Sequence, residues 1–560
     1  MFSAGTQKKT MIWSRLFAVL LTVVAASPIC LAQVSGSATL RVTVKDPNGA
    51  VVPRATVILT SERTGEQRRA ETSSEGTTGF ASLNPGAYTV RIEAANFKSS
   101  EQRITLNPND TRGLDVMLEV GAPTETVTVT AETEQIQTET GARENTITAQ
   151  QIDNLSIVSR SSLELLRVLP GVVAPFPDDP GFQSVSFNSG ANANNRYNVN
   201  GIRGENNNVS IDGSRVIDIG ANNGTIITAN NDMVQEVKVQ TSNYLPEYGA
   251  SGVQITATTK GGGREFHGTL YDYVRHYKLN ANDRSRTTFG LERQKEQYQY
   301  PGGNIGGPIC LPRFGEGGPI GKCYRDKLFF FFGFEVQRQK VDPGTRFDIV
   351  PTLEQRQGRN FRHQYTGQTF NLDPSQITPI GRAFLNFYPL PNFNDPTGRF
   401  NYQFSGLQPI NRTQGVLRFD YKPNDKVTAY LRLARESEEQ DYARGLWWNP
   451  SAYELPSHVL GTNLGRSAAL NITTVISPTM TNETVLSASK LMLDNDYREP
   501  EKVSLSALGI SNYTGPFGQQ SPYAPVAFIT SWGGLTQGDF WESVACRCSL
   551  ITPAIRCRTR

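Results

Sequence analysis

Residues 264–493 contain segments with the length and the alternation of membrane-crossing β-strands. Apolar Leu417, Phe419 and Tyr421, for example, alternate with Arg418 and Asp420. A strand that crosses a bilayer needs about 9–11 residues, with its apolar side chains on one face only. The segments that meet this description are 264–276, 297–308, 327–339, 414–421, 427–437, 466–476 and 483–493. Their pattern restricts this part of the chain to an antiparallel sheet with one apolar face.

The connections between these segments alternate in length. Long loops at 277–296, 340–413 and 438–465 are separated by shorter turns at 309–326, 422–425 and 477–482. This order is typical of a transmembrane antiparallel β-barrel, with long loops outside and short turns inside the cell envelope. We expect Leu417, Phe419, Tyr421, Val427, Ala429, Leu431 and Leu433 to face lipid, and Arg418, Asp420, Thr428 and Arg432 to face the lumen. The alternative is a β-rich domain in water.

The N-terminus has the features of an export signal. Lys8, Lys9 and Arg15 precede an apolar run at 16–26, and a small residue, Ala32, stands at the expected cleavage site. The run is too short to span a membrane. We predict a signal peptide over residues 1–32 and an exported protein; a buried hydrophobic helix is the alternative.

Residues 38–119 predict an immunoglobulin-like β-sandwich. Short period-two strands, such as the one with Tyr88, Val90 and Ile92, are separated by turns rich in Pro, Gly and Asn. The segments 49–59, 79–80 and 83–90 resemble the carboxypeptidase regulatory-like domain. That resemblance implies a non-catalytic module, which we interpret as a spacer or docking domain.

Residues 141–262 differ in character from the regions on either side. A short helix with Leu163, Leu166 and Leu169 is predicted between a serine cap at 161 or 162 and Pro170. Residues 188–243 are rich in Asn and Gly, which favour turns, but strand fragments at 209–211 and 234–239 interrupt them. A disordered polar loop is the alternative to a folded domain here.

Three stretches resemble one family when they are taken in order. They are NGIRGENNNVSIDG at 200–213, VQEVKVQTSNYLPEYGASGVQITATTKGGGREFHGTLYDYVR at 234–275, and DKLFFFFGFE at 326–335. They look like the plug and first barrel strands of TonB-dependent outer-membrane receptors, in particular the Oar-like subgroup with an N-terminal regulatory-like domain. The resemblance implies a mainly β protein in the outer membrane, with an α/β plug at 141–262 and part of a barrel at 263–545.

The linker at 120–140 contains ETVTVTA, which resembles the TonB box of that family. Alternating β-branched residues favour an extended backbone, which can add a strand to the sheet edge of a partner. The alternatives are a plain linker or the last strand of the sandwich. The resemblance implies TonB, with its inner-membrane energising complex, as a partner. The predicted coupling residues are Glu125, Thr126, Val127, Thr128, Val129, Thr130 and Ala131.

The resemblance also implies import of an extracellular substrate of unknown identity. The ligand would contact the outer loops and the plug apex, at Asn192, Asn194, Asn195, Arg196, Asn206, Asn207 and Asn208. One rival function is a surface binding or adhesion protein without active transport. A passive porin is another, although a porin has no reason to keep a plug.

Catalysis, metal binding and nucleic-acid binding find no support in the sequence. The four histidines are scattered, no metal-ligand or catalytic motif is present, and we expect neither an enzyme nor a cofactor. The Asp212-Gly213 pair is interpreted as a turn. The formal net charge of +3 includes no basic block, which argues against nucleic acid.

The cysteines mark two features. Cys310 and Cys323 lie in a Gly- and Pro-rich stretch and are predicted to form a disulfide after export. Residues 546–560 hold three more cysteines, are basic and lack alternation, so they are interpreted as an aberrant tail. The family barrel has about 22 strands, whereas seven or eight are visible here. We therefore predict a truncated or frameshifted copy.

Overall fold

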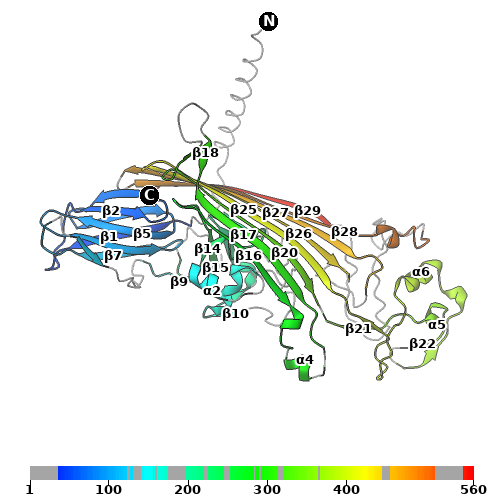
Figure 1. Ribbon diagram of the computed structural model, residues 1–560. Coiled ribbons are helices and arrows are strands. Elements are labelled where there is room, and N and C mark those ends of the chain that lie inside the picture. The colour runs from blue at the N-terminus through cyan, green and yellow to red at the C-terminus, as the bar shows by residue number, and fades with distance from the viewer. Residues whose placement is uncertain are drawn as a thin grey trace, which may run out of the picture.

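The computed structural model describes residues 36–122, 126–129, 140–155, 157, 160–173, 197–217, 225–244, 252–282, 284–288, 290, 292–312, 321–342, 344–363, 366–443, 454–477, 480–510 and 546–559. The predicted signal peptide lies outside them. They form a sandwich, a plug and a long sheet that we call the wall (Figure 1). No helix in this part of the chain is both long and apolar enough to cross a membrane.

The sandwich consists of two sheets with an apolar core between them. The first sheet has the order β4-β1-β7, from β1 (Ala38–Lys45), β4 (Thr77–Leu83) and β7 (Thr111–Met117). The second has the order β3-β2-β5-β6-β8, from β2 (Thr56–Ser61), β3 (Gln67–Glu71), β5 (Gly86–Glu93), β6 (Ser99–Leu106) and β8 (Thr126–Val129). Alternate side chains such as Leu40, Val42, Val90 and Ile92 are buried between the sheets, as the period-two pattern predicts.

The wall is an eight-stranded antiparallel sheet whose neighbours follow the order of the chain. Its strands are β16 (His267–His276), β17 (Gln297–Pro308), β20 (Leu328–Val341), β25 (Gln408–Asn424), β26 (Val427–Tyr442), β27 (Val459–Ser477), β28 (Met480–Tyr497) and β29 (Cys546–Thr559). Seven of them fall on the predicted segments. β27 begins earlier than predicted because Thr462 and Asn463 are polar, so hydrophobic alternation does not mark this end of the strand.

The two faces of the wall differ in exposure as the alternation predicts. Leu431 and Leu433 are 36% and 40% exposed, whereas Arg432 between them is fully buried. Arg418 is also buried, and Tyr421 is exposed on the other face. The buried polar face of the wall is the one that the plug covers.

Residues 546–559, from the segment interpreted as an aberrant tail, join the wall, and the truncation or frameshift stays a prediction. They form β29, which pairs antiparallel with β28 from Asn482 to Asn495. Strand pairing uses main-chain hydrogen bonds, which do not require alternating side chains. The absence of alternation was therefore a poor guide to whether this segment joins the sheet.

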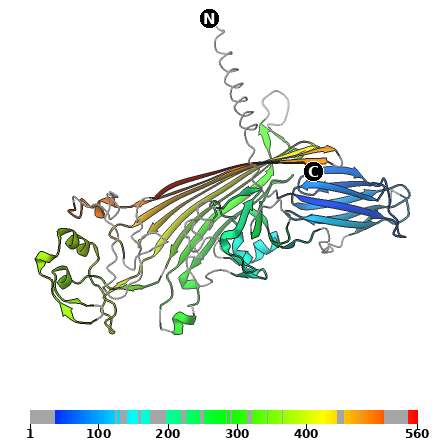
Figure 2. The same cartoon turned by 180° about the vertical axis from the view of Figure 1, so that it is seen from behind.

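The two ends of the wall carry different structures. The sandwich lies at the end with the short turns, and the long loops lie at the opposite end in both views (Figure 2). The loop structures after β16 are η4 (Tyr277–Leu279) and α4 (Arg284–Thr288), and η6 (Pro500–Lys502) follows β28. Those between β20 and β25 are β21 (Arg346–Asp348), α5 (Leu353–Arg356), β22 (Phe361–Arg362), β23 (Thr369–Phe370), η5 (Pro374–Gln376), α6 (Pro379–Phe387) and β24 (Tyr402–Phe404).

The plug is a five-stranded sheet with short helices on one face. Its order is β13-β12-β15-β14-β9, from β9 (Arg143–Ile147), β12 (Asn207–Ile211), β13 (Ser214–Arg215), β14 (Val234–Ser242) and β15 (Val253–Thr259). The other elements are α2 (Ala149–Asn154), the 3-10 helices η1 (Ser162–Val168) and η2 (Gly204–Asn206), and the pair β10 (Val172–Val173) and β11 (Asn198–Val199).

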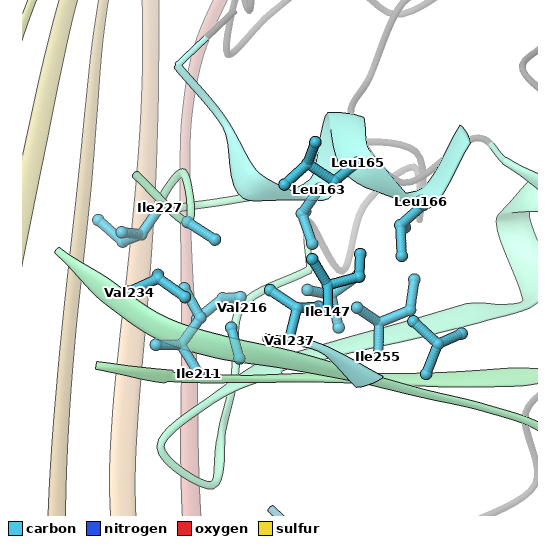
Figure 3. Packing of buried hydrophobic residues seen from close by; sticks show 14 of the residues in the cluster. Ile147, Leu163, Leu165, Leu166, Ile211, Val216, Ile227, Val234, Val237 and Ile255 are labelled. Carbon is cyan, nitrogen blue, oxygen red and sulfur yellow. The ribbon is translucent and has the colours of Figure 1, made fainter. Parts of the chain in front are cut away.

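The predicted leucine helix of the plug is η1. Leu163 and Leu166 are fully buried and lie over Val237 and Ile255 of the sheet (Figure 3). The helix ends at Val168, close to the proline that was predicted to stop it. The plug therefore has an apolar core on one face, and Phe331, Val416, Ala434 and Leu491 of the wall belong to the same cluster, so plug and wall share apolar as well as polar contacts.

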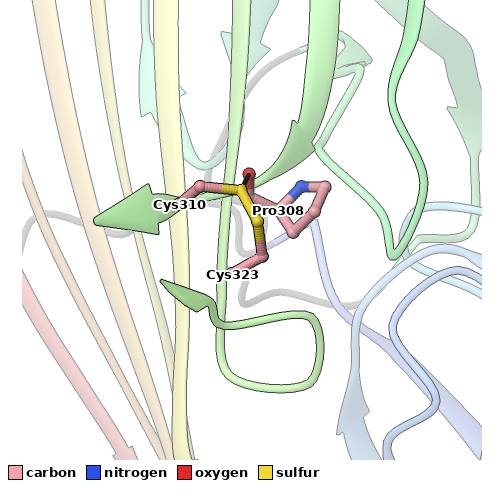
Figure 4. Close-up of a disulfide and its surroundings, with 3 residues drawn as sticks. All are labelled: Pro308, Cys310 and Cys323. Carbon is pink, nitrogen blue, oxygen red and sulfur yellow. Dashed lines mark hydrogen bonds between the residues drawn. A yellow bond between two sulfur atoms is a disulfide. The ribbon is translucent and has the colours of Figure 1, made fainter. Parts of the chain in front are cut away.

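The turn between β17 and β20 carries a short hairpin, β18 (Cys310–Pro312) with β19 (Gly321–Cys323). Cys310 and Cys323 lie opposite each other in this hairpin and form a disulfide, with the sulfur atoms 1.94 Å apart (Figure 4). The hairpin lies at the same end of the wall as the sandwich.

Candidate functional site: the coupling segment and the contact of the plug with the wall

The predicted coupling segment is extended, and it is paired with the sandwich. Thr126–Val129 forms β8 and runs parallel to β6, from Ser99 to Gln102. Glu125, Thr130 and Ala131 lie outside the described residues. The position of β8 as an edge strand of the second sheet agrees with the alternative interpretation of this segment as the last strand of the sandwich. The coupling role itself stays a prediction.

The predicted ligand residues of the plug apex fall into two groups. Asn192, Asn194, Asn195 and Arg196 lie outside the described residues. Of the others, Asn206 ends η2, and Asn207 and Asn208 begin β12.

The described apex residues mainly hold the plug together. The main-chain oxygen of Asn206 accepts a hydrogen bond from Gly252 at 2.8 Å. Asn207 is buried, and its side chain donates to the main-chain oxygen of Tyr197 at 2.8 Å. The side chain of Asn208 donates to Gln254, also at 2.8 Å. Ligand contact at these residues stays a prediction.

Asp212 joins the plug to the wall. It stands at the turn between β12 and β13, where Asp212 and Gly213 have φ angles of +49° and +77°. Asp-Gly is the sequence preferred where both central residues of a turn are left-handed. The carboxylate accepts hydrogen bonds from the main chain and the hydroxyl of Thr259, at 3.0 and 2.6 Å. Its oxygens also lie 3.6 Å from Arg418 and 3.4 Å from Arg432, two buried wall residues.

Arg160 makes a second contact between plug and wall. Its guanidinium lies between Asp232 of the plug, with which it forms an ion pair, and Glu335 on β20, at 3.2 Å. The rings of Tyr271 and Tyr273, both on β16, lie 5.4 and 4.1 Å from the guanidinium carbon. Arg160 is 6% exposed, so the cation depends on these partners for its solvation.

A third contact lies at Glu436 on β26. Its two carboxylate oxygens accept hydrogen bonds from the main chain and the hydroxyl of Thr228, at 2.7 and 2.9 Å. Arg412 neutralises Glu436 at 3.3 Å and Glu438 at 2.7 Å. All three charged residues are buried. The carboxylates and guanidiniums of the wall are thus paired with one another, and the paired groups contact polar groups of the plug.

These contacts define what the interface can do. Ion pairs and hydrogen bonds fix the plug at discrete positions, whereas an apolar contact has no fixed register. Removing one partner of a buried ion pair costs about 3–5 kcal/mol, so the plug stays seated without external work. Within the described ranges, no cluster of His, Cys, Asp or Glu could hold a metal ion.

The sequence did not predict these contacts between the plug and the wall. Asp212 was identified as a turn residue, which is correct, but its arginine partners lie more than 200 positions away along the chain. The alternation of the wall does place Arg418 and Arg432 on the buried face. Only the position of the plug against the wall shows which carboxylate these arginines bind.

The long-loop end of the wall contains a cavity of about 510 Å³. Its lining is mixed aromatic and charged, and it consists of Phe387, Pro389, Tyr402, Glu454, Leu455, Pro456, His458, Arg498, Glu499 and Lys502. At its edge the imidazole of His458 lies 3.0 Å from both Asp441 and Glu454. The hydrogen bond to Asp441 raises the pKa of His458, although partial burial opposes this. These residues come from three separate loops, and no local pattern connects them.

Comparison with protein families identifies three regions. Residues 39–119 match the carboxypeptidase regulatory-like domain, residues 136–254 the TonB-dependent receptor plug domain, and residues 258–544 an outer membrane beta barrel domain. The last match alone covers half of the chain. The chain belongs to the TonB-dependent receptor family and is a protein of the outer membrane. Members of this family are receptors and transporters rather than enzymes.

One curated relative is the TonB-dependent transporter Oar of Myxococcus xanthus. It is 28% identical over 300 residues, which cover 50% of this chain and 25% of Oar. The aligned part thus spans about a quarter of the length of this relative.

Solved structures with a similar arrangement include two outer-membrane proteins. The transporter YddB from Escherichia coli is 13% identical, with a TM-score of 0.39, over 63% of this chain and 40% of that protein. The siderophore receptor PirA from Acinetobacter baumannii is 12% identical, with a TM-score of 0.38, over 74% and 44%. At these scores the likeness supports no conclusion about function.

Proposed function

We propose that this protein binds an extracellular substrate and imports it with energy supplied through TonB. The observation that carries the proposal is the order of the parts. An extended β-branched segment immediately precedes a plug that polar contacts hold against the wall. Work applied at the segment has a direct path along the chain into β9 of the plug.

The plug contacts suit a part that moves and returns. Ser214 of the plug is fully buried, and its hydroxyl lies 3.2 and 3.3 Å from those of Ser467 and Ser489 on the wall. A hydrogen bond of this kind contributes only about 0.5–1.5 kcal/mol net, so each single contact breaks at modest cost.

Coupling is tested by binding of the isolated periplasmic domain of TonB to the full chain in detergent. Val127→Pro removes a main-chain donor and restricts the backbone, so we expect binding to weaken by about tenfold or more. Gln135→Pro, in the same linker but outside the coupling segment, is the matched control and should bind normally. Equal binding by the two variants would contradict the coupling role.

Movement of the plug is tested in cells with Ser214→Cys. The buried thiol should react with a maleimide only when TonB and the proton-motive force are present. Ser375→Cys, on the exposed loop insertion, controls for labelling that needs no movement. A surface binding protein without transport would show no effect of a protonophore at either position, and this result would favour that alternative.

A further inference from the structure

The loop between β6 and β7 of the sandwich reaches one face of the plug sheet. Asn109 is 6% exposed, and its side-chain amide donates to the hydroxyl of Thr256 at 3.2 Å. The neighbouring carboxylate of Asp110 accepts from the ammonium of Lys238 at 2.6 Å. Thr256 on β15 and Lys238 on β14 are directly opposite in the register of the plug sheet. Two consecutive loop residues therefore hold one cross-strand pair.

Lys238 joins three separate segments of the chain. Its side chain is fully buried, and its ammonium also lies 2.9 Å from the carboxylate of Glu144 on β9. β9 is the edge strand of the plug sheet, and it pairs only with β14 among the described strands. One buried cation thus binds the sandwich loop, the edge strand and the strand next to it.

The neighbouring acid does not compete for this cation. Glu236 precedes Lys238 on the same strand and is 5% exposed. Burial is the main cause that raises its pKa to about 8, and Asp110 raises it further, while Lys238 opposes the shift. A neutral Glu236 leaves two anions, Asp110 and Glu144, beside two cations, Lys238 and Arg112, the latter 3.2 Å from Asp110.

The sandwich holds the chain both within the linker and after it. Within the linker at 120–140, β8 lies on the β6 edge of the sandwich. After the linker, β9 is bound to the sandwich through Glu144, Lys238 and Asp110. Contacts with the wall fix the sandwich in place: Ser37 donates to Glu483 at 2.8 Å, and Arg63 lies 3.6 Å from the carboxylate of Asp420.

We propose that the sandwich is a latch on the plug. It stores the coupling strand on its β6 edge, and it clamps the edge strand of the plug through Lys238. The inference rests on the proposed function, because it takes residues 125–131 as the segment that TonB grips. TonB would have to displace β8 from β6 before pulling, and the pull would then reach β9, where Glu144 separates from Lys238. The regulatory-like domain is therefore a working part of the coupling path.

The storage of β8 is tested with a reversible cross-link. Glu101 on β6 and Thr128 on β8 are directly paired, so Glu101→Cys with Thr128→Cys should form a disulfide on oxidation, identified by peptide mass. The periplasmic domain of TonB should bind the oxidised protein at least about tenfold more weakly than the reduced protein. Ile58→Cys with Arg69→Cys, paired at the far side of the same sheet, is the matched control and should not affect binding.

Each result of the cross-link experiment has a distinct meaning. If no disulfide joins positions 101 and 128, β8 is not stored on the sandwich and the latch is refuted. Equal binding by the oxidised and reduced forms refutes the latch but leaves the coupling role intact. Failure of TonB to bind even the reduced and the unmodified protein refutes the coupling role instead.

The clamp is tested by amide hydrogen exchange of the full chain in detergent. Asp110→Asn removes the charge that the sandwich offers to Lys238, and we expect exchange in β9 to rise about tenfold or more. Exchange in β12, on the far side of the plug sheet, should stay unchanged, which separates the clamp from a general loss of stability. Asp115→Asn, an exposed acid on the same sandwich, is the control. Unchanged exchange in β9 would overturn the clamp.

Discussion

Replacing Asp212 is the sharpest test of how the plug is held. In Asp212→Ala, the fully buried Arg432 loses its carboxylate partner, and Arg418 keeps Asp420, at 2.9 Å, and the main-chain oxygen of Thr259, at 3.1 Å. Breaking a buried ion pair by removing one partner costs about 3–5 kcal/mol. The backbone at φ +49° adds about 1 kcal/mol, because alanine tolerates a left-handed conformation poorly. We expect a total loss of about 4–6 kcal/mol in the free energy of plug opening.

Two further variants separate the charge from the turn. Asp212→Asn keeps a residue that tolerates the left-handed backbone and keeps one acceptor for Thr259, so it should cost about 2–3 kcal/mol. Asp115→Ala removes an acid whose partner, Lys45, lies 3.3 Å away at the surface. That pair should contribute at most about 1 kcal/mol.

The assay is native-state hydrogen exchange of the β15 amides in the full chain. A loss of about 4–6 kcal/mol accelerates exchange through plug opening by roughly 10³- to 10⁴-fold, at about 1.4 kcal/mol per factor of ten. We expect exchange to be fastest in Asp212→Ala, slower in Asp212→Asn and slowest in the surface control Asp115→Ala. If Asp212→Ala exchanges no faster than Asp115→Ala, the buried ion pairs are not what seats the plug.

Further predictions concern pH and oxidation. Because folding raises the pKa of Glu236 to about 8, the folded plug holds a proton that the unfolded chain releases above about pH 4.5. The free energy of unfolding of the plug should therefore fall by up to about 1.4 kcal/mol per pH unit as pH rises towards 8. Urea titrations should show this slope in the unmodified protein and not in Glu236→Gln. The hydrogen bond to Asp441 raises the pKa of His458, so the stabilisation that protonated His458 gives is complete below about pH 6.5 and is lost as pH rises through the pKa of the folded state. Hydrogen exchange of nearby loop amides should accelerate over this pH range in the unmodified protein, and this acceleration should be absent in His458→Gln. Cys310 and Cys323 should resist alkylation until reduced, and two free thiols by mass would contradict their pairing.

The strands of the wall could be predicted from the sequence because their order in the sheet follows their order in the chain. Each strand from β16 to β28 pairs with its neighbours along the sequence, and alternation alone decides which face of β26 is buried. The sandwich core and the Asp212-Gly213 turn were predictable because alternation and turn residues are local signals. In each case, residues within a few positions of one another decide the structure.

What only the tertiary structure decided are the partners that lie far apart in the chain. Local periodicity does not show that Asp212 meets Arg418 and Arg432, or that one ammonium, Lys238, bridges the sandwich and the plug. The coupling strand shows this limit most clearly. Its β-branched alternation predicted an extended backbone, which is a local property. Its place on the β6 edge depends on a free row of main-chain hydrogen bonds that exists only after the sandwich has folded.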